Sequence, residues 1–185
     1  MKDVLGDSKI RLSALAIAFF WFIGGFINVV AIQVANEITE SAKLTSATTG
    51  MGTELAYLLA SASGGMILGG ALASYSSRRS IELGLVPIGG VLMVIGSLAL
   101  VFVPTDGGWF KFWIGFTGFG ASIFLVPLNA YLQDNCSEKK RGKVIAGSNL
   151  LDCLAGAFAL GLFSGLLAAG VSINHQFILI SILCI

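Results

Sequence analysis

Residues 12–34 read LSALAIAFFWFIGGFINVVAIQV, a run of 23 residues without a charged side chain. The hydrocarbon core of a bilayer is about 30 Å thick, so an α-helix needs roughly 20 residues to cross it. A backbone inside lipid must satisfy its own hydrogen bonds, which favours a helix over an isolated strand. This stretch therefore predicts a transmembrane helix.

Four further apolar runs of similar length follow, at Leu55–Tyr75, Leu83–Val103, Trp109–Leu132 and Val144–Val171. A last run, Phe177–Ile185, is too short to cross a bilayer and is expected to be the truncated start of a sixth span. The composition agrees, because 56% of residues are hydrophobic and only 11% are charged, which is outside the usual globular range. We expect an all-α, polytopic membrane protein in which residues 1–185 form a single transmembrane domain.

The basic residues are distributed unevenly between the two sides of these predicted spans. With the N-terminus placed inside, only Lys43 and Lys111 lie outside, and nine lie inside: Lys2, Lys9, Arg11, Arg78, Arg79, Lys139, Lys140, Arg141 and Lys143. Short cytoplasmic loops are enriched in Lys and Arg. The pattern predicts a cytoplasmic N-terminus, with residues 35–53 and 104–108 as outside loops.

Two basic runs stand beside predicted helix ends. Arg78 and Arg79 form the first, and Lys139, Lys140 and Arg141 begin the second. Such residues usually fix topology and contact anionic lipid headgroups. We interpret both runs as topology anchors with membrane lipids as partners, rather than as a nucleic-acid site.

Small residues four apart mark two predicted helix faces. Ser61, Gly65 and Gly69 share one face of the second span, and Ala157, Gly161 and Gly165 share one face of the fifth. Small residues at this spacing let transmembrane helices approach closely. We expect Gly65, Gly69, Gly161 and Gly165 to lie at helix–helix contacts, whether as static packing or as sliding surfaces.

Pro127 lies inside the fourth span, downstream of Gly120. A proline in a helix interior removes a backbone hydrogen bond and generally kinks the helix. We therefore expect Pro127 and Gly120 to act as a hinge or gate, with a purely structural kink as the alternative.

Asp152 is the costliest residue to place in a membrane. It is expected near mid-bilayer, where an ionised carboxylate costs about 2.5–3.5 kcal/mol and should face a cavity or a partner. Asn149 is three residues earlier, and Asn129 and Gln133 are four apart in the fourth span. These four side chains predict a polar gate on a substrate path, with Asn28 as a further candidate. The alternative is an interhelical hydrogen-bond cluster.

Other chemistry is not indicated by the sequence. It contains no glycine-rich phosphate loop, no nucleophile elbow and no His-Glu metal pair, and His175 is the single histidine. We expect no catalytic residues, no cofactor and no metal site in this chain.

Several strings resemble a known family. Residues 79–87 (RSIELGLVP), 126–133 (VPLNAYLQ) and 141–149 (RGKVIAGSN), with the pair Phe20 and Trp21, are similar to the C-terminal half of lysophospholipid transporters of the major facilitator superfamily. They are closest to the form fused to an acyltransferase and an acyl-carrier-protein synthetase. Some stand-alone members carry a basic residue about where Asn28 stands.

This resemblance implies an MFS-type six-helix half bundle, equivalent to spans seven to twelve of a twelve-span carrier, in a bacterial inner membrane. It implies movement of lysophosphatidylethanolamine-like substrates to the cytoplasmic leaflet for reacylation. The implied partners are the missing N-terminal half and fused acyltransferase and synthetase domains. Two alternatives are a facilitator for a small polar solute or drug, and a membrane anchor for a fused acyltransferase.

Overall fold

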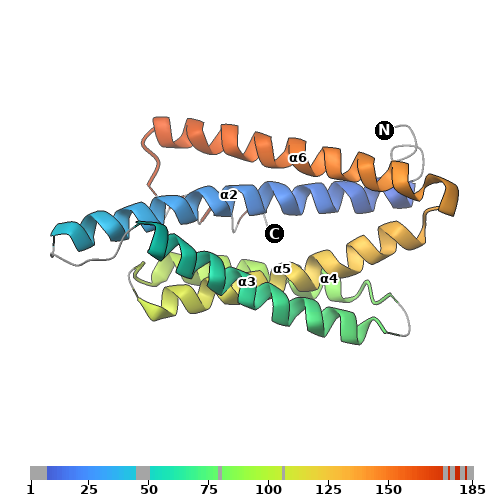
Figure 1. Ribbon diagram of the computed structural model, residues 1–185, viewed down its shortest axis with the longest axis horizontal. Helices are drawn as coiled ribbons and strands as arrows, with labels where there is room; N and C mark the ends of the chain where they lie inside the picture. Colours follow the sequence, from blue (N-terminus) through green and yellow to red (C-terminus); the bar gives the residue numbers. More distant parts are fainter. Residues whose placement is uncertain are drawn as a thin grey trace.

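The computed structural model describes residues 8–44, 51–78, 81–105, 107–172, 175, 178–179 and 182, and those described elements are helical. Five helices run back and forth along one long axis (Figure 1). Their bounds are α2 (Ser8–Leu44), α3 (Met51–Ser76), α4 (Leu85–Phe102), α5 (Gly108–Asp134) and α6 (Glu138–Ala168). All five are long and apolar enough to cross a membrane. The all-α prediction is confirmed, while the predicted sixth span at Phe177–Ile185 lies largely outside the described residues.

The first predicted outside loop is shorter than residues 35–53. α2 continues to Leu44 and α3 already begins at Met51, although the membrane-compatible part of α2 ends at Asn36. Residues 35–44 contain neither glycine nor proline, so nothing in the backbone ends the helix where its apolar character ends. Hydropathy therefore predicted the end of the membrane-compatible segment of α2 but not the end of the helix.

The second basic run is helical rather than part of a loop. α6 begins at Glu138, so Lys139, Lys140 and Arg141 occupy its first turn. Lys, Arg and Glu are good helix formers, and an acidic residue in the first turn interacts favourably with the positive end of the helix dipole. At the other end, Gly170 adopts a φ of 75° and the Val171 amide donates to the Leu166 carbonyl. This is the bonding pattern of a Schellman motif, which ends the helix before Val171.

α5 is the centre of a three-helix group with α3 and α4. Gly65 and Gly69 of α3 lie against Gly115 and Phe119 of α5, so these two helices run parallel. Gly89 and Gly96 of α4 lie against Phe124 and Thr117 of α5, in the opposite order, so α4 runs antiparallel to α5. A glycine at each contact lets the backbones approach closely.

α2 and α6 form a second group and run parallel to each other (Figure 1). Their rings meet in register, with Phe22 against Phe158 at 5.9 Å and Phe26 against Phe163 at 5.5 Å between centroids. α2 also contacts α3 and α5, so it joins the two groups. A buried cluster from α2, α5 and the start of α6, including Ile17, Leu132 and Val144, closes one end of the molecule.

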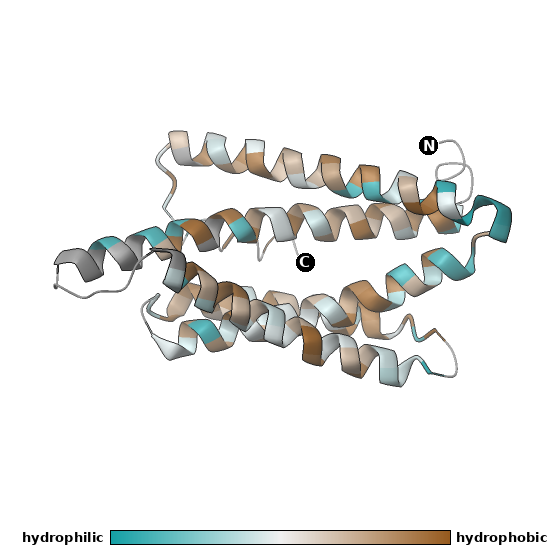
Figure 2. Ribbon diagram, in the orientation of Figure 1, coloured by the Kyte–Doolittle hydropathy of each residue, from teal (hydrophilic) through white to brown (hydrophobic). Residues whose placement is uncertain are grey.

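The two ends of the bundle differ in polarity. Figure 2 shows hydrophilic residues concentrated at the end that holds the α5–α6 turn, while apolar residues prevail along the middle of the helices. The described residues of the predicted inside set all lie towards that end: Lys9, Arg11, Arg78, Lys139, Lys140, Arg141 and Lys143. The charge asymmetry inferred from the sequence is therefore present in three dimensions.

Candidate functional site

Asp152 lies on the face of α6 that packs against α2. It follows buried Ser148 by four residues and precedes buried Ala159 by seven, and Ala159 lies 3.3 Å from a Cβ built on Gly25 of α2. The side chain is half-buried, and its Oδ1 atom is fully buried with no hydrogen-bond partner among the described residues. Unpartnered buried polar atoms are uncommon in folded proteins and call for an explanation. We name the contact between α2 and α6 around Asp152 and Gly156 the α2–α6 seam.

α2 and α6 approach closely at Gly25, beside the turn of α6 that follows Asp152. A Cβ atom built on Gly25 would lie 3.3 Å from Ala159 Cβ and 3.4 Å from Gly156 Cα. The ring pairs Phe22–Phe158 and Phe26–Phe163 flank this close approach. Asp152 therefore lies one turn before a close helix contact made of glycine backbone and aromatic rings.

Asn149 does not share the buried environment of Asp152. It is exposed, whereas the neighbouring Ser148 is buried, so Ser148 occupies the seam-facing position one turn before Asp152. At 100° per residue, a three-residue separation offsets two side chains by about 60°. That offset is enough to move Asn149 out of the seam, so its exposed side chain lies apart from Asp152.

Asn129 and Gln133 on α5 also have different surroundings. Asn129 is half-buried and its Nδ2 donates to the Leu125 carbonyl at 3.2 Å, while Gln133 is exposed in the last turn of α5. Within the described chain no hydrogen bond joins these amides to Asn149 or Asp152. α5 and α6 meet near their shared turn, and α2 packs against both. The four predicted gate residues are thus not assembled into one cluster in this arrangement.

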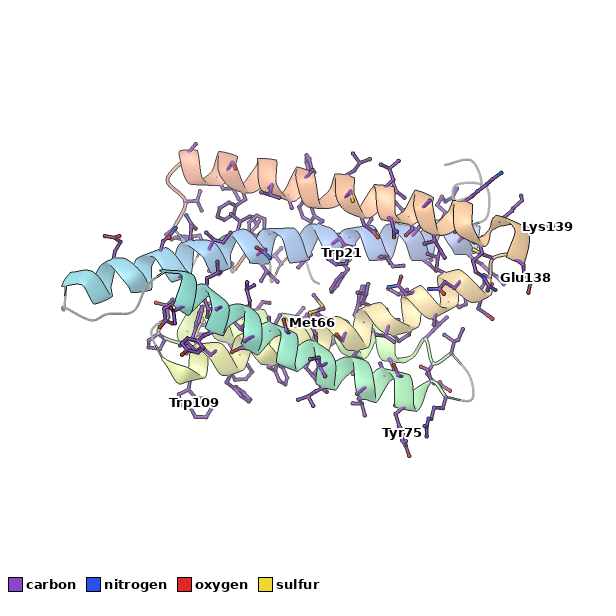
Figure 3. The ribbon with its side chains drawn as sticks, viewed as in Figure 1. Trp21, Met66, Tyr75, Trp109, Glu138 and Lys139 are labelled. Atoms are coloured by element: carbon purple, nitrogen blue, oxygen red, sulfur yellow. The ribbon has the colours of Figure 1, made fainter. Side chains whose placement is uncertain are left out.

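Asn28 is exposed on α2, seven residues after Trp21 and so on the same helix face. Figure 3 shows Trp21 extending from α2 toward the group that contains α3 and α5, and Met66 lying on the facing side of α3. Trp21 is 44% exposed, so its ring is not enclosed by these helices.

The predicted hinge residues are both buried within α5. α5 continues as one helix through Pro127, and Figure 1 shows its last turns leaving α3 and rising toward α6. Gly120 faces α4, where an added Cβ would lie 2.8 Å from Leu92 Cβ. Close packing against α4 is therefore a sufficient structural reason for glycine at position 120.

The two predicted glycine faces differ in whether they contact another helix. An added Cβ on Gly65 would overlap the Gly115 carbonyl, and one on Gly69 would overlap the Phe119 carbonyl. By contrast, a Cβ on Gly161 or Gly165 would meet nothing within 4 Å in the part of the chain that is described. The prediction of a helix contact for Gly161 and Gly165 is not met there, because α6 presents Ala159 and Phe163 to α2 instead.

The described topology anchors are exposed at the polar end. Arg78, Lys139, Lys140 and Arg141 are solvent-accessible, whereas Arg79 lies outside the described residues. The Arg78 guanidinium stands 5.3 Å from the centre of the Tyr75 ring, a cation–π distance. Figure 3 places Tyr75, Glu138 and Lys139 at this same end of the bundle.

One polar cluster was missed by the sequence reasoning. At the opposite end, Lys111 Nζ lies 3.1 Å from Glu54 Oε2 and 4.9 Å from the centre of the Tyr57 ring. Glu54 and Tyr57 are three apart on α3, and that spacing signals a shared helix face. Only the parallel packing of α3 on α5 brings Lys111 to that face.

Comparisons of this chain with protein-family models, with curated proteins and with solved structures find no match. Among the described residues no group of three or more His, Cys, Asp or Glu side chains is placed to hold a metal ion. The α2–α6 seam at Asp152 is the site that the geometry offers for a function in the membrane.

Proposed function

We propose that this chain is one helical half of a membrane transport protein of the major facilitator type, and that it moves lysophospholipid toward the cytoplasmic leaflet. The observation that carries the proposal is Asp152, a carboxyl group within a membrane-length helix whose buried Oδ1 has no partner among the described residues. Intramembrane acidic residues generally face a bundle interior or water-filled path and mark substrate or ion pathways. A purely structural anchor has no need of such a residue.

The substrate class follows from the charges that this site offers. A lysophosphatidylethanolamine headgroup carries an ammonium, which a carboxylate attracts, and a phosphate, which basic and amide side chains bind. The exposed basic residues at the α5–α6 turn favour the surface of an anionic leaflet. The resemblance of residues 126–133 and 141–149 to lysophospholipid transporters supports the same substrate.

The functional test measures movement of headgroup-labelled lysophosphatidylethanolamine in inside-out bacterial membrane vesicles that contain the protein encoded by its natural reading frame. A charge-assisted hydrogen bond contributes roughly 1.5–3 kcal/mol, so Asp152→Asn should slow movement by about tenfold or more. Asp134→Asn is the matched control, because Asp134 is exposed at the end of α5. Equal rates for Asp152→Asn and the native protein, at equal amounts of folded protein, would remove Asp152 from the path.

The same vesicles separate the proposed substrate from the alternatives. Labelled lysolipid that moves no faster than in vesicles without the protein would refute lysophospholipid transport. A facilitator for a small polar solute or a membrane anchor would then be the better description. Movement of lysolipid with a phosphocholine headgroup at the same rate would show that the glycerophosphate, and not the primary ammonium, is recognised.

The proposal places the N-terminus and the basic end of the bundle in the cytoplasm, by the positive-inside rule. Cys136 is a poor reporter of this orientation, because it is buried and its Sγ lies 2.9 Å from the Leu132 carbonyl. Ser137 is the next residue and is exposed. A Ser137→Cys protein in intact spheroplasts should resist a membrane-impermeant thiol reagent until the membrane is opened. Labelling without permeabilisation would show that Ser137 faces the periplasm and that the proposed topology is inverted.

A further inference from the structure

Several polar side chains in these helices satisfy a hydrogen bond within their own helix. The hydroxyls of Ser13, Ser61, Thr117 and Ser164 each donate to the carbonyl four residues earlier, over 2.8–3.0 Å. Asn129 does the same through its amide group. Inside a membrane this arrangement lets a helix carry a polar side chain without a partner from another helix.

Asp152 can use this arrangement in only one of its protonation states. An ionised carboxylate only accepts hydrogen bonds, whereas a protonated carboxyl also carries an O–H donor. As an acceptor, the buried Oδ1 finds no donor among the described residues. As a donor, the protonated group has the Ser148 carbonyl four residues earlier on its own helix, the position that the hydroxyls above use.

No charged group compensates a carboxylate at this depth in the described chain. On α6 the nearest basic residue in sequence is Lys143, nine residues earlier or about 13 Å along the axis at 1.5 Å per residue. On α2 the described charged side chains are Lys9 and Arg11 in the first turn and Glu40 near the far end. On α5 the titratable side chains on the same half are Tyr131 and Asp134, both in the last turn.

We propose that Asp152 is a proton-binding site of the α2–α6 seam: it holds a proton while the two helices are packed as here, and releases it to water when the seam opens. In the packed seam Gly25 lies against Gly156 and Ala159, one and two turns beyond Asp152 on α6. Opening hydrates the carboxylate, which favours its charged form. The link between this proton and substrate movement rests on the proposed transport function, but the site itself does not.

Infrared spectroscopy of the protein in lipid bilayers tests the site directly. A protonated carboxyl has a carbonyl stretch that is separate from the bands of carboxylates and amides. At neutral pH the native protein should show this band, Asp152→Asn should lose it, and Asp134→Asn should retain it. If the Asp152→Asn and native spectra are identical in this region at neutral pH, Asp152 is ionised in the packed seam and the inference is overturned.

A second measurement follows the opening of the seam. Ser148→Cys, in a background with Cys136, Cys153 and Cys184 replaced by serine, puts a thiol at a buried seam position. The labelling rate of this thiol should rise more steeply with pH when Asp152 is retained than when it is replaced in Asp152→Asn. In the Asp152→Asn protein, the pH dependence comes from titration of the thiol itself. Parallel pH profiles for the two proteins would contradict the inference, since the carboxyl would then have no influence on the seam.

These outcomes are distinct from failure of the proposed function. A protonated-carboxyl band that depends on Asp152, in a protein that moves no lysolipid, supports the proton site and refutes lysophospholipid transport. Lysolipid movement with no such band, and with parallel labelling profiles, supports transport and overturns the proton site.

Discussion

The group of α3, α4 and α5 is packed through backbone, whereas the pair of α2 and α6 is packed through side chains. In the first group glycines such as Gly65, Gly69 and Gly89 lie so close to α5 that an added Cβ would overlap its backbone. In the pair, the rings of Phe26 and Phe163 make contact. The helices also approach at Gly25, where an added Cβ would lie 3.3 Å from Ala159 Cβ. The two groups therefore differ in how far their helices can move apart without losing their fit.

Backbone-to-backbone contacts fix helices in one register, because a shift of one helix drives carbonyl groups into Cα atoms. Ring contacts are broader and change orientation at lower cost, since aromatic pairs are favourable over a range of offsets and tilts. The unpartnered carboxyl of Asp152 lies in the second kind of contact. We therefore expect α3, α4 and α5 to keep their relative positions, and α2 and α6 to separate more easily.

The largest effect is expected from Gly65→Ala in α3. Its methyl group would overlap the Gly115 carbonyl, which is backbone and cannot turn aside. Overpacking costs about 1–3 kcal/mol or more, enough to lower the yield of folded protein. The measurement is the free energy of unfolding by detergent titration in mixed micelles.

The matched control for this variant is Gly64→Ala, one residue earlier. A Cβ on Gly64 meets nothing within 4 Å, and alanine is favoured over glycine in a helix by about 1 kcal/mol. Gly64→Ala should therefore be neutral or stabilising. Equal stability of the two variants would mean that α3 and α5 are not locked through their backbones.

A smaller effect is expected from the ring pair of the seam. Phe26 and Phe163 pack edge to face at 5.5 Å, and their coupling in a double-mutant cycle to alanine should be about 0.5–1.5 kcal/mol. The same titration measures it. Zero coupling would show that α6 is not held by this pair in the membrane.

Gly25→Ala sharpens the comparison because it makes the same substitution in the looser group. Its methyl would lie 3.3 Å from Ala159 Cβ, so a displacement of a few tenths of an ångström accommodates it. We expect a change in stability of less than about 1 kcal/mol, well below the effect of overpacking in a fixed core. A loss as large as that of Gly65→Ala would mean that the seam is as rigid as the α3–α5 contact.

The smallest effect is expected from the ion pair of Lys111 with Glu54. It lies near a helix end and is partly exposed, and such pairs contribute about 0.2–1 kcal/mol. Lys111→Met should lower stability by no more than this, with a smaller difference at high salt because screening weakens the native pair. An effect that is large and independent of salt would show instead that the Lys111 contact with the Tyr57 ring dominates.

Much of the fold was predictable because hydropathy and helix length act locally. The five membrane-length helices follow from their apolar runs, and the Gly65–Gly69 face follows from a four-residue spacing that any helix imposes. The ends of α2 and α6 were predicted less well, because polar residues with good helix propensity continue a helix past its apolar segment. The candidate site was predicted only in part, since Asp152 is in the seam while Asn149 and Gln133 are exposed.

The sequence by itself determined that this chain is a set of membrane-length helices with nine of its eleven basic residues on one side. Apolar run length and charge position depend on neither partner nor packing. Only the tertiary structure decided that α3 and α6 use their small residues differently, and that Lys111 meets Glu54 across two helices. It also decided that α6, the helix that carries Asp152, packs against α2. The reason is physical: a helix offers several faces of similar composition, and the face that becomes a contact depends on what the neighbouring helices can bring against it.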